Sequence, residues 1–266
     1  MERPFFDDLP VKKDLSTPRC ALRSRRQEEL LDSHASVFCI QILMRPFLPE
    51  PDLSERIHDS VLEAICSGEL KAGERITQED LAQKFGVSRQ PVLQAMMLLR
   101  REGFLIEAGR KGVCVAPLDL QKARNLYVVR GALDGVAARL AAARYTPDLA
   151  YRGRLLLDVG RRAIKSGNVQ SVIEADIDFH LFIYEASGNP LIGETAQPHW
   201  QHMRRVMAAA LSEDDMRVSV WDEHQVILNT LEAGNAVHAE ALCRDHVEKM
   251  ADILMGRLKD VISRAA

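Results

Sequence analysis

Residues 81–92 read LAQKFGVSRQPV, which is the pattern of a short amphipathic helix, a tight turn and the start of a second helix. The apolar residues up to Phe85 follow helical spacing, and Gly86 supplies the turn. Ser88 is a favoured residue type for the N-cap of the next helix, whose apolar face continues to a stop at Gly103. Two helices joined in this way predict a helix-turn-helix.

The residues on either side predict a winged version of this motif. The apolar residues from Leu53 to Ile65 follow the spacing of a preceding helix. Two short apolar runs, at 104–106 and 113–115, stand on either side of a Gly-rich turn and predict a β-hairpin. Residues 51–117 are therefore expected to form a winged helix-turn-helix, which is a DNA-binding domain.

Side chains suited to contacting DNA lie near the starts of the two helices of the motif and at the tip of the hairpin. Arg89 can bind guanine with its forked guanidinium, and Gln90 and Gln94 can pair with adenine. Basic residues at a hairpin tip suit phosphate or minor-groove contacts. The predicted DNA-binding residues are Gln78, Ser88, Arg89, Gln90, Leu93, Gln94, Arg110, Lys111 and Gly112.

The remaining chain falls into two zones of different composition. Residues 118–266 are rich in Ala and Leu and show 3.6-residue apolar periodicity that only capping residues interrupt. This pattern predicts an all-α bundle of six or seven helices, so the fold class as a whole is mainly α. Residues 1–50 mix prolines with scattered charge and are expected to be a disordered N-terminal extension.

Bulk composition excludes several classes of protein. Apolar residues make up 47% of the chain and charged residues 27%, which excludes a wholly disordered or collagen-like chain. The net charge of −3 gives no global basic field, so any DNA binding depends on local charge. The apolar runs are too short for a membrane helix, and the five cysteines are scattered without a C-x-x-C pair. We expect a cytoplasmic protein with reduced thiols that does not contact membranes.

Three histidines of the helical zone lie on apolar helix faces. Asp176 and His180 are spaced i,i+4 and share a face, while His224 and His246 lie on apolar stripes further along. Three imidazoles and one carboxylate that point into a bundle form an N₃O ligand set suited to Zn²⁺ or Ni²⁺. A single inward histidine is more commonly a hydrogen-bonded core residue, and periodicity does not decide between these two roles.

The winged-helix zone resembles the DNA-binding domain of the GntR family of transcription regulators. The resemblance rests on GELKAGERI at 68–76, GVSRQPV at 86–92 and GVCV at 112–115. That family usually carries Arg where this chain has Leu93, which removes a DNA contact and predicts an altered operator sequence or affinity. The nearly neutral charge of residues 51–117 predicts weak binding by a single copy, so a homodimer on palindromic double-stranded operator DNA is expected.

The helical zone is similar to the FCD effector domain found in the FadR branch of that family. The matching segments are RGALD at 130–134, DIDFH at 176–180, EHQVI at 223–227 and RDH at 244–246, with Asp134 where Glu is usual. The resemblance implies a divalent metal ion, with Zn²⁺ or Ni²⁺ as the expected choice. The metal ligands that it implies are Asp176, His180, His224 and His246.

A five- or six-coordinate ion held by four protein ligands would leave positions that a small carboxylic acid could fill. An arginine beside the ion would clamp such an anion. Arg130 is the first candidate for this effector-binding role and Arg205 the second.

These features predict a transcription regulator without catalytic activity, in which an organic acid at the metal site changes operator affinity. Repression that the ligand releases is the expected sign of control, and activation is equally compatible with the residues. Two alternatives stay open. The bundle could hold an apolar acyl effector without any metal, or the Asp/His set could belong to a metal-dependent hydrolase, although the chain has no H-E-x-x-H motif.

Overall fold

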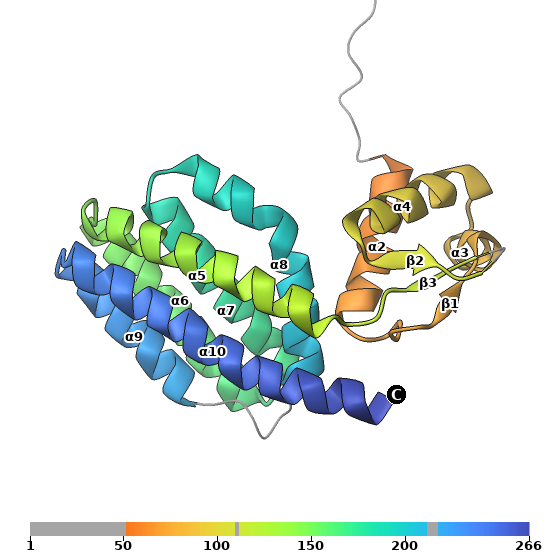
Figure 1. Cartoon of the computed structure of the whole chain (residues 1–266). Coiled ribbons are helices and arrows are strands. Elements are labelled where there is room, and N and C mark those ends of the chain that lie inside the picture. Colours follow the sequence, from red (N-terminus) through yellow and green to blue (C-terminus); the bar gives the residue numbers. More distant parts are fainter. Residues whose placement is uncertain (1–51, 110–111, 212–217, 266) are drawn as a thin grey trace, which may run out of the picture. The chain divides into compact units, whose positions relative to one another are not determined.

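The computed structural model describes residues 52–109, 112–211 and 218–265. The extension expected at 1–50 and the predicted DNA contacts Arg110 and Lys111 lie outside these residues. The described part is mainly helical, with a winged helix-turn-helix followed by a helical bundle, and this confirms the predicted fold class (Figure 1). Within it, no helix is both long enough and apolar enough to cross a membrane.

In its described residues, 52–109 and 112–117, the winged-helix domain contains three helices and a small antiparallel sheet. These are α2 (Leu53–Cys66), β1 (Arg75–Ile76), α3 (Gln78–Phe85), α4 (Arg89–Glu102), β2 (Leu105–Glu107) and β3 (Val113–Val115). The predicted hairpin is confirmed as β2 paired with β3. The strand β1 was not predicted; it pairs with the other side of β3, so the strand order is β1-β3-β2.

Local side-chain chemistry sets the turn between α3 and α4. The Thr77 hydroxyl accepts a hydrogen bond from the Asp80 backbone N–H at 3.1 Å and so caps the start of α3. Gly86 ends that helix with φ +66°, in the left-handed region that favours glycine. Ser88 stands at the predicted N-cap of α4, but its hydroxyl makes no capping hydrogen bond. The position of the cap was therefore right, and the hydroxyl is left exposed at the start of the helix.

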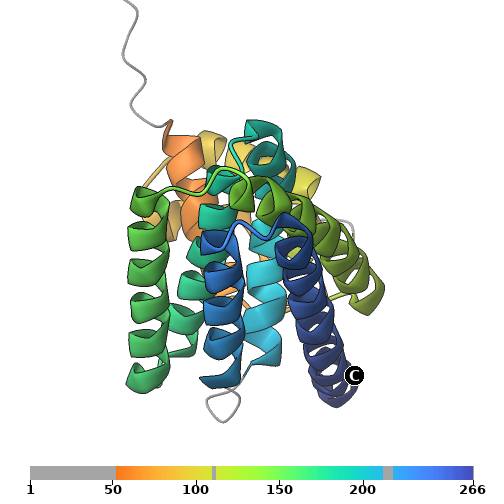
Figure 2. The same cartoon turned by 90° about the vertical axis from the view of Figure 1, so that its left-hand side faces the viewer.

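The bundle contains six helices within the described residues. They are α5 (Leu120–Ala142), α6 (Pro147–Ser166), α7 (Val169–Ala186), α8 (Pro190–Ala210), α9 (Val218–Glu232) and α10 (Ala236–Ala265). Figure 2 shows α6, α9, α10 and α5 following one another across one face, and each packs against the next. The helices α7 and α8 pack against this layer, and the core between them is largely aliphatic.

Glycines allow two close approaches that shape the interior of the bundle. The antiparallel pair α5 and α10 meets at Gly135, where an added Cβ would lie 3.3 Å from the Glu240 carbonyl oxygen. On α6, a Cβ at Gly160 would lie only 2.0 Å from the Trp221 ring. The missing side chain at Gly160 therefore leaves the space in which the α9 indole sits, next to the histidines described below.

Candidate functional site

Four side chains from three helices of the bundle converge on one point. Asp176 and His180 come from α7, His224 from α9 and His246 from α10, and their ligand-type atoms all lie within 4.8 Å of one another. Asp176 Oδ1 is 3.5 Å from His224 Nε2 and 3.8 Å from His180 Nε2. The three imidazoles are buried, whereas the Asp176 side chain is partly exposed. The structure thus brings together all four predicted metal ligands.

Carboxylates on the far side of two of these rings orient them. Glu223 accepts a hydrogen bond from His246 Nδ1 at 2.8 Å, and Asp134 Oδ2 lies 2.8 Å from His180 Nδ1, although the second contact is poorly aligned for a hydrogen bond. With Nδ1 directed to a carboxylate, each ring presents Nε2 to the cluster. Carboxylate partners of this kind commonly fix the tautomer and the orientation of metal-binding histidines.

Several buried nitrogen atoms of the cluster lack the partners that a closed core would supply. Among the described residues, His180 Nε2 has no hydrogen-bond partner. His224 Nε2 and His246 Nε2 lie 3.1 Å apart, within hydrogen-bonding distance, so the two rings are each other's partner at this point of the cluster. Since Nδ1 of His246 donates to Glu223, its Nε2 carries a lone pair that points into the cluster. A cation held by these nitrogens and Asp176 would satisfy the lone pairs, so the residues fit a divalent metal ion.

Burial also favours the neutral, metal-binding form of two of the rings, those of His180 and His224. It lowers the pKa of His180 below its ordinary value, and the nearby Arg130 lowers it further. The pKa of His224 lies well below the ordinary value, first because of burial and then because of the neighbouring His246. Neutral imidazoles are the form that coordinates metal ions, so these nitrogens need not lose a proton at neutral pH.

Asp134 is a further residue of the candidate site, and the sequence analysis assigned it no role. It is 1% exposed, accepts a hydrogen bond from the Tyr184 hydroxyl and lies 3.5 Å from Arg130 Nε as well as beside His180. Burial acts to raise the pKa of Asp134, but His180, Arg130 and the Tyr184 hydrogen bond outweigh it and lower the pKa. The only signal in the sequence was the i,i+4 spacing from Arg130, together with the departure from the usual Glu.

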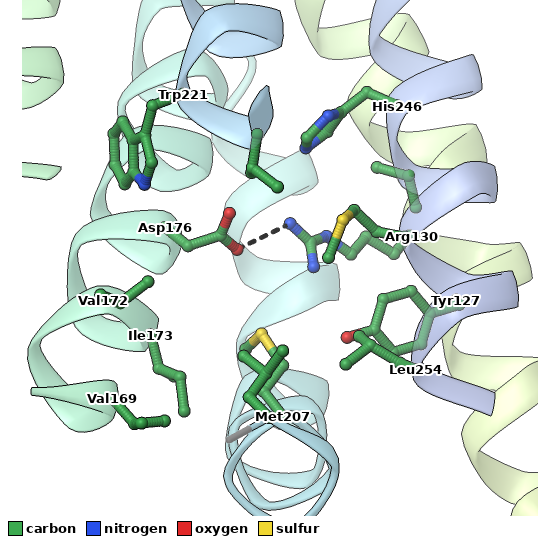
Figure 3. A pocket seen from close by; sticks show the side chains of 14 residues that line it. Tyr127, Arg130, Val169, Val172, Ile173, Asp176, Met207, Trp221, His246 and Leu254 are labelled. Carbon is green, nitrogen blue, oxygen red and sulfur yellow. Dashed lines mark hydrogen bonds and ion pairs between the residues drawn. The ribbon is translucent and has the colours of Figure 1, made fainter. Parts of the chain in front are cut away.

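A cavity of about 50 Å³ opens beside the cluster, several times the room that one water molecule needs. Asp176, His246 and Arg130 lie at its polar side (Figure 3). Most of the remaining wall is aliphatic, and Val172 and Met207 are examples. The cavity therefore combines a charged end with an apolar body.

Arg130, the first predicted effector-binding residue, lines the cavity beside the cluster. Its guanidinium is buried, 3.4 Å from Asp176 Oδ2, and it stacks on the Trp200 ring at 4.8 Å from the centroid. Beside it, the buried Tyr127 hydroxyl has no hydrogen-bond partner in the described part of the chain. Tyr127 was not singled out from the sequence, because an aromatic residue on a helix face reads as ordinary core.

The structure does not bring Arg205 to the cavity, contrary to its prediction as a second clamp. Its side chain is buried and donates a hydrogen bond to the carbonyl of Ala116, in the segment that joins β3 to α5. Met207 of the same helix faces the cavity, and a spacing of two residues turns Arg205 to a different side.

The predicted DNA-binding residues within the described ranges gather on α4, the start of α3 and the adjoining wing. Arg89, Leu93 and Gln78 line one groove with Gly112 of the wing. Arg89 forms an exposed ion pair with Glu79, at 3.2 Å. Gln90 and Gln94 are also exposed on α4, and the Ser88 hydroxyl precedes them. The groove therefore presents hydrogen-bonding and apolar groups from the first turns of α4.

Both domains match known protein families. Residues 53–115 match the family described as bacterial regulatory proteins, gntR family, and residues 125–249 match the FCD domain. These families and the relatives named below are transcriptional regulators rather than enzymes, so the hydrolase alternative is set aside.

Relatives and solved structures agree with these matches. The chain is 27% identical to the Nta operon transcriptional regulator of Aminobacter aminovorans over 73% of this chain and 92% of that protein. It is 21% identical to the HTH-type transcriptional repressor RspR of Escherichia coli K12 over 77% of this chain and 90% of that protein. A GntR-type regulator from Rhodococcus sp. RHA1 shares the fold, with a TM-score of 0.66 at 22% identity over 76% of this chain and 97% of that one. The chain belongs to the GntR family of bacterial DNA-binding transcriptional regulators, in the FadR-like arrangement with a C-terminal FCD domain.

Proposed function

We propose that this regulator is a homodimeric repressor whose affinity for a palindromic operator is controlled by a small organic acid bound at a metal ion in the FCD domain. The observation that carries the proposal is the cluster of Asp176, His180, His224 and His246, of which Asp176 and His246 line the polar end of a cavity. A divalent ion at this N₃O set, with Zn²⁺ or Ni²⁺ as the best-suited ions, would supply positive charge and open coordination positions to a carboxylate.

The residues around the cavity favour an acid with an apolar tail. Arg130 places a buried positive charge at the polar end, and the unpartnered Tyr127 hydroxyl can donate a hydrogen bond to a carboxylate or to a substituent next to it. Aliphatic residues such as Ile173 and Leu254 would pack against the tail. A second carboxylate on the tail would lie among these aliphatic residues, where it would lose its hydration without gaining a cation as a partner. Monocarboxylates should therefore bind better than dicarboxylates.

The helix α8 connects the cavity to the DNA-binding domain. Met207 lines the cavity, and three residues earlier Arg204 donates a hydrogen bond to Glu63 of α2 at 2.7 Å. Arg205 holds the segment at Ala116 that leads from the wing into the bundle. A ligand that displaces α8 would change these contacts and, through them, the placement of the recognition helices. Effector binding in the cavity and operator binding by α4 would then be coupled in free energy.

The proposal is tested by metal analysis and thermal unfolding of the purified full-length chain. We expect close to one divalent ion per chain and a melting temperature that rises with short branched or aromatic monocarboxylates, because a ligand at 100 times its Kd stabilises the folded state by about 2.7 kcal/mol. Prior treatment with a chelator should abolish the rise, and matched dicarboxylates should produce little of it. A chain that binds no ion yet responds fully to the acids would contradict the metal-dependent function and favour an effector held by apolar contacts alone.

A change at Arg89 tests the DNA-binding surface separately. Arg89→Ala should lose about 1–3 kcal/mol of discrimination between a duplex selected from a random pool and the same duplex with its preferred guanine replaced, because a bidentate guanine contact is lost. Fluorescence anisotropy of labelled duplexes measures both affinities at fixed salt. Arg162→Ala removes the same charge from an exposed position on α6 and is the control. Equal discrimination by the Arg89→Ala and Arg162→Ala variants would show that Arg89 does not contact a base.

A further inference from the structure

Two large apolar side chains are exposed on the recognition helix α4. Leu93 is 39% exposed and Met97 is 59% exposed, whereas Val92, Ala95 and Leu99 on the inner face of the same helix are completely buried. The core of the domain is therefore filled without Leu93 and Met97. Single exposed apolar side chains are common on folded proteins, but Leu93 and Met97 lie one helical turn apart and line the same groove, so their positions together point to a bound partner.

These two residues form one stripe with two arginines. Arg89, Leu93, Met97 and Arg100 follow one another at helical spacing and line a single groove between α4 and the wing. Each arginine already has a carboxylate partner, Glu79 for Arg89 and Glu107 for Arg100. Each end of the stripe therefore carries a positive charge that a carboxylate partly neutralises. We expect the apolar side chains between the two arginines to contribute to base selectivity as well as the arginines themselves.

Only one apolar group is displayed on base edges in the major groove, the C5-methyl of a pyrimidine. Thymine carries this group, and cytosine carries it when methylated at C5. The stripe matches such a surface, because its arginines suit phosphates or guanine while its centre suits a methyl group. If the groove instead bound an apolar surface of another protein, the two flanking arginines would have no function in the contact.

We infer that Leu93, with Met97 beside it, contacts the C5-methyl group of a pyrimidine in the major groove and thereby helps to specify the operator. The inference rests on the proposed function, in which α4 contacts operator DNA. Four residues of helix rise by about 6 Å, so the methylated pyrimidine should lie within about two base pairs of the base that Arg89 contacts. At this position the chain would read a methyl group where its family usually places an arginine.

The test begins with selection of duplexes from a random pool by the full-length chain. Thymine should be enriched within about two base pairs of the preferred guanine. Replacing that thymine with uracil removes only the methyl group and should weaken binding by about three- to fivefold, the effect of losing one buried methyl-sized contact. Uracil in place of a thymine outside the contacted bases is the matched control. Leu93→Ala and Leu93→Arg, both at an exposed position, should bind the thymine and uracil duplexes equally.

Further duplexes distinguish thymine from 5-methylcytosine as the source of the methyl group. They also distinguish failure of the methyl contact from failure of DNA binding as a whole. Replacing the T·A pair with C·G should weaken binding; if 5-methylcytosine then restores it, either base serves, and if not, the contact requires thymine. A wild-type chain that binds the uracil duplex as tightly as the thymine duplex overturns the inference while leaving DNA binding intact. Enrichment of no duplex at all overturns the DNA-binding part of the proposed function as well.

Discussion

The His224→Ala variant is expected to lose the proposed metal ion and, with it, the proposed response to the organic acid. His224 is completely buried, and its ring stacks on Phe179 with centroids 4.3 Å apart. Its Nε2 lies within 3.5 Å of both His246 Nε2 and Asp176 Oδ1, so its removal takes away a central donor of the cluster. Changing a residue that only supports a metal ligand typically costs about 10–100-fold in affinity, and losing a ligand should cost more.

The measurements are metal content, thermal unfolding with and without the acid, and operator binding. We expect undetectable metal after dialysis, no acid-dependent rise in melting temperature, and a dimer that still binds its selected duplex. His238→Ala is the matched control, because it removes an exposed imidazole from the same bundle. A variant that lacks the ion but keeps the full acid response would show that the cluster does not mediate the response. The apolar acyl effector would then become the better explanation.

The helices were predictable because each carries its own local signals. Caps such as Thr77, turn glycines such as Gly86 and the apolar stripes are encoded within a few residues, and the structure places the predicted helix-turn-helix and hairpin where the pattern put them. The strand β1 was missed because two residues, Arg75 and Ile76, carry no alternation pattern. Its existence depends on pairing with a strand about forty residues later in the chain, which periodicity cannot reveal.

The candidate metal ligands were predictable only in part from the residues themselves. The i,i+4 spacing placed Asp176 and His180 on one face, but their convergence with His224 and His246 depends on how three helices pack. Glu223 was not assigned a role, because a glutamate next to a histidine reads as an exposed charge; it becomes meaningful only when His246 of α10 is found 2.8 Å away. The sequence also did not show which side of α8 faces the cavity, so it gave no reason to exclude Arg205.

The Asp134→Asn variant is expected to lower both the stability of the bundle and its affinity for the metal ion. The change keeps the shape of the side chain but removes a buried negative charge that lies 3.5 Å from Arg130 Nε and 2.8 Å from His180 Nδ1. Breaking a buried ion pair costs about 3–5 kcal/mol, and because Arg130 keeps Asp176 as a partner we expect about 3 kcal/mol. Denaturant unfolding of the metal-free chain measures this loss directly.

The effect on metal affinity separates a positioning role for Asp134 from a purely structural one. If Asp134 orients the His180 ring, Asp134→Asn should weaken metal binding by about 10–100-fold under conditions where the variant is fully folded. Asp134→Glu, which introduces the residue usual at this position in the FCD family, should recover most of the metal affinity even where stability is only partly restored. Tyr184→Phe removes the hydrogen bond that the Tyr184 hydroxyl donates to Asp134 and should lower stability with a smaller effect on the metal, because Asp134 keeps its position beside His180. If Asp134→Asn lost stability but bound the ion as tightly as the wild type, Asp134 would serve only to neutralise Arg130 within the core.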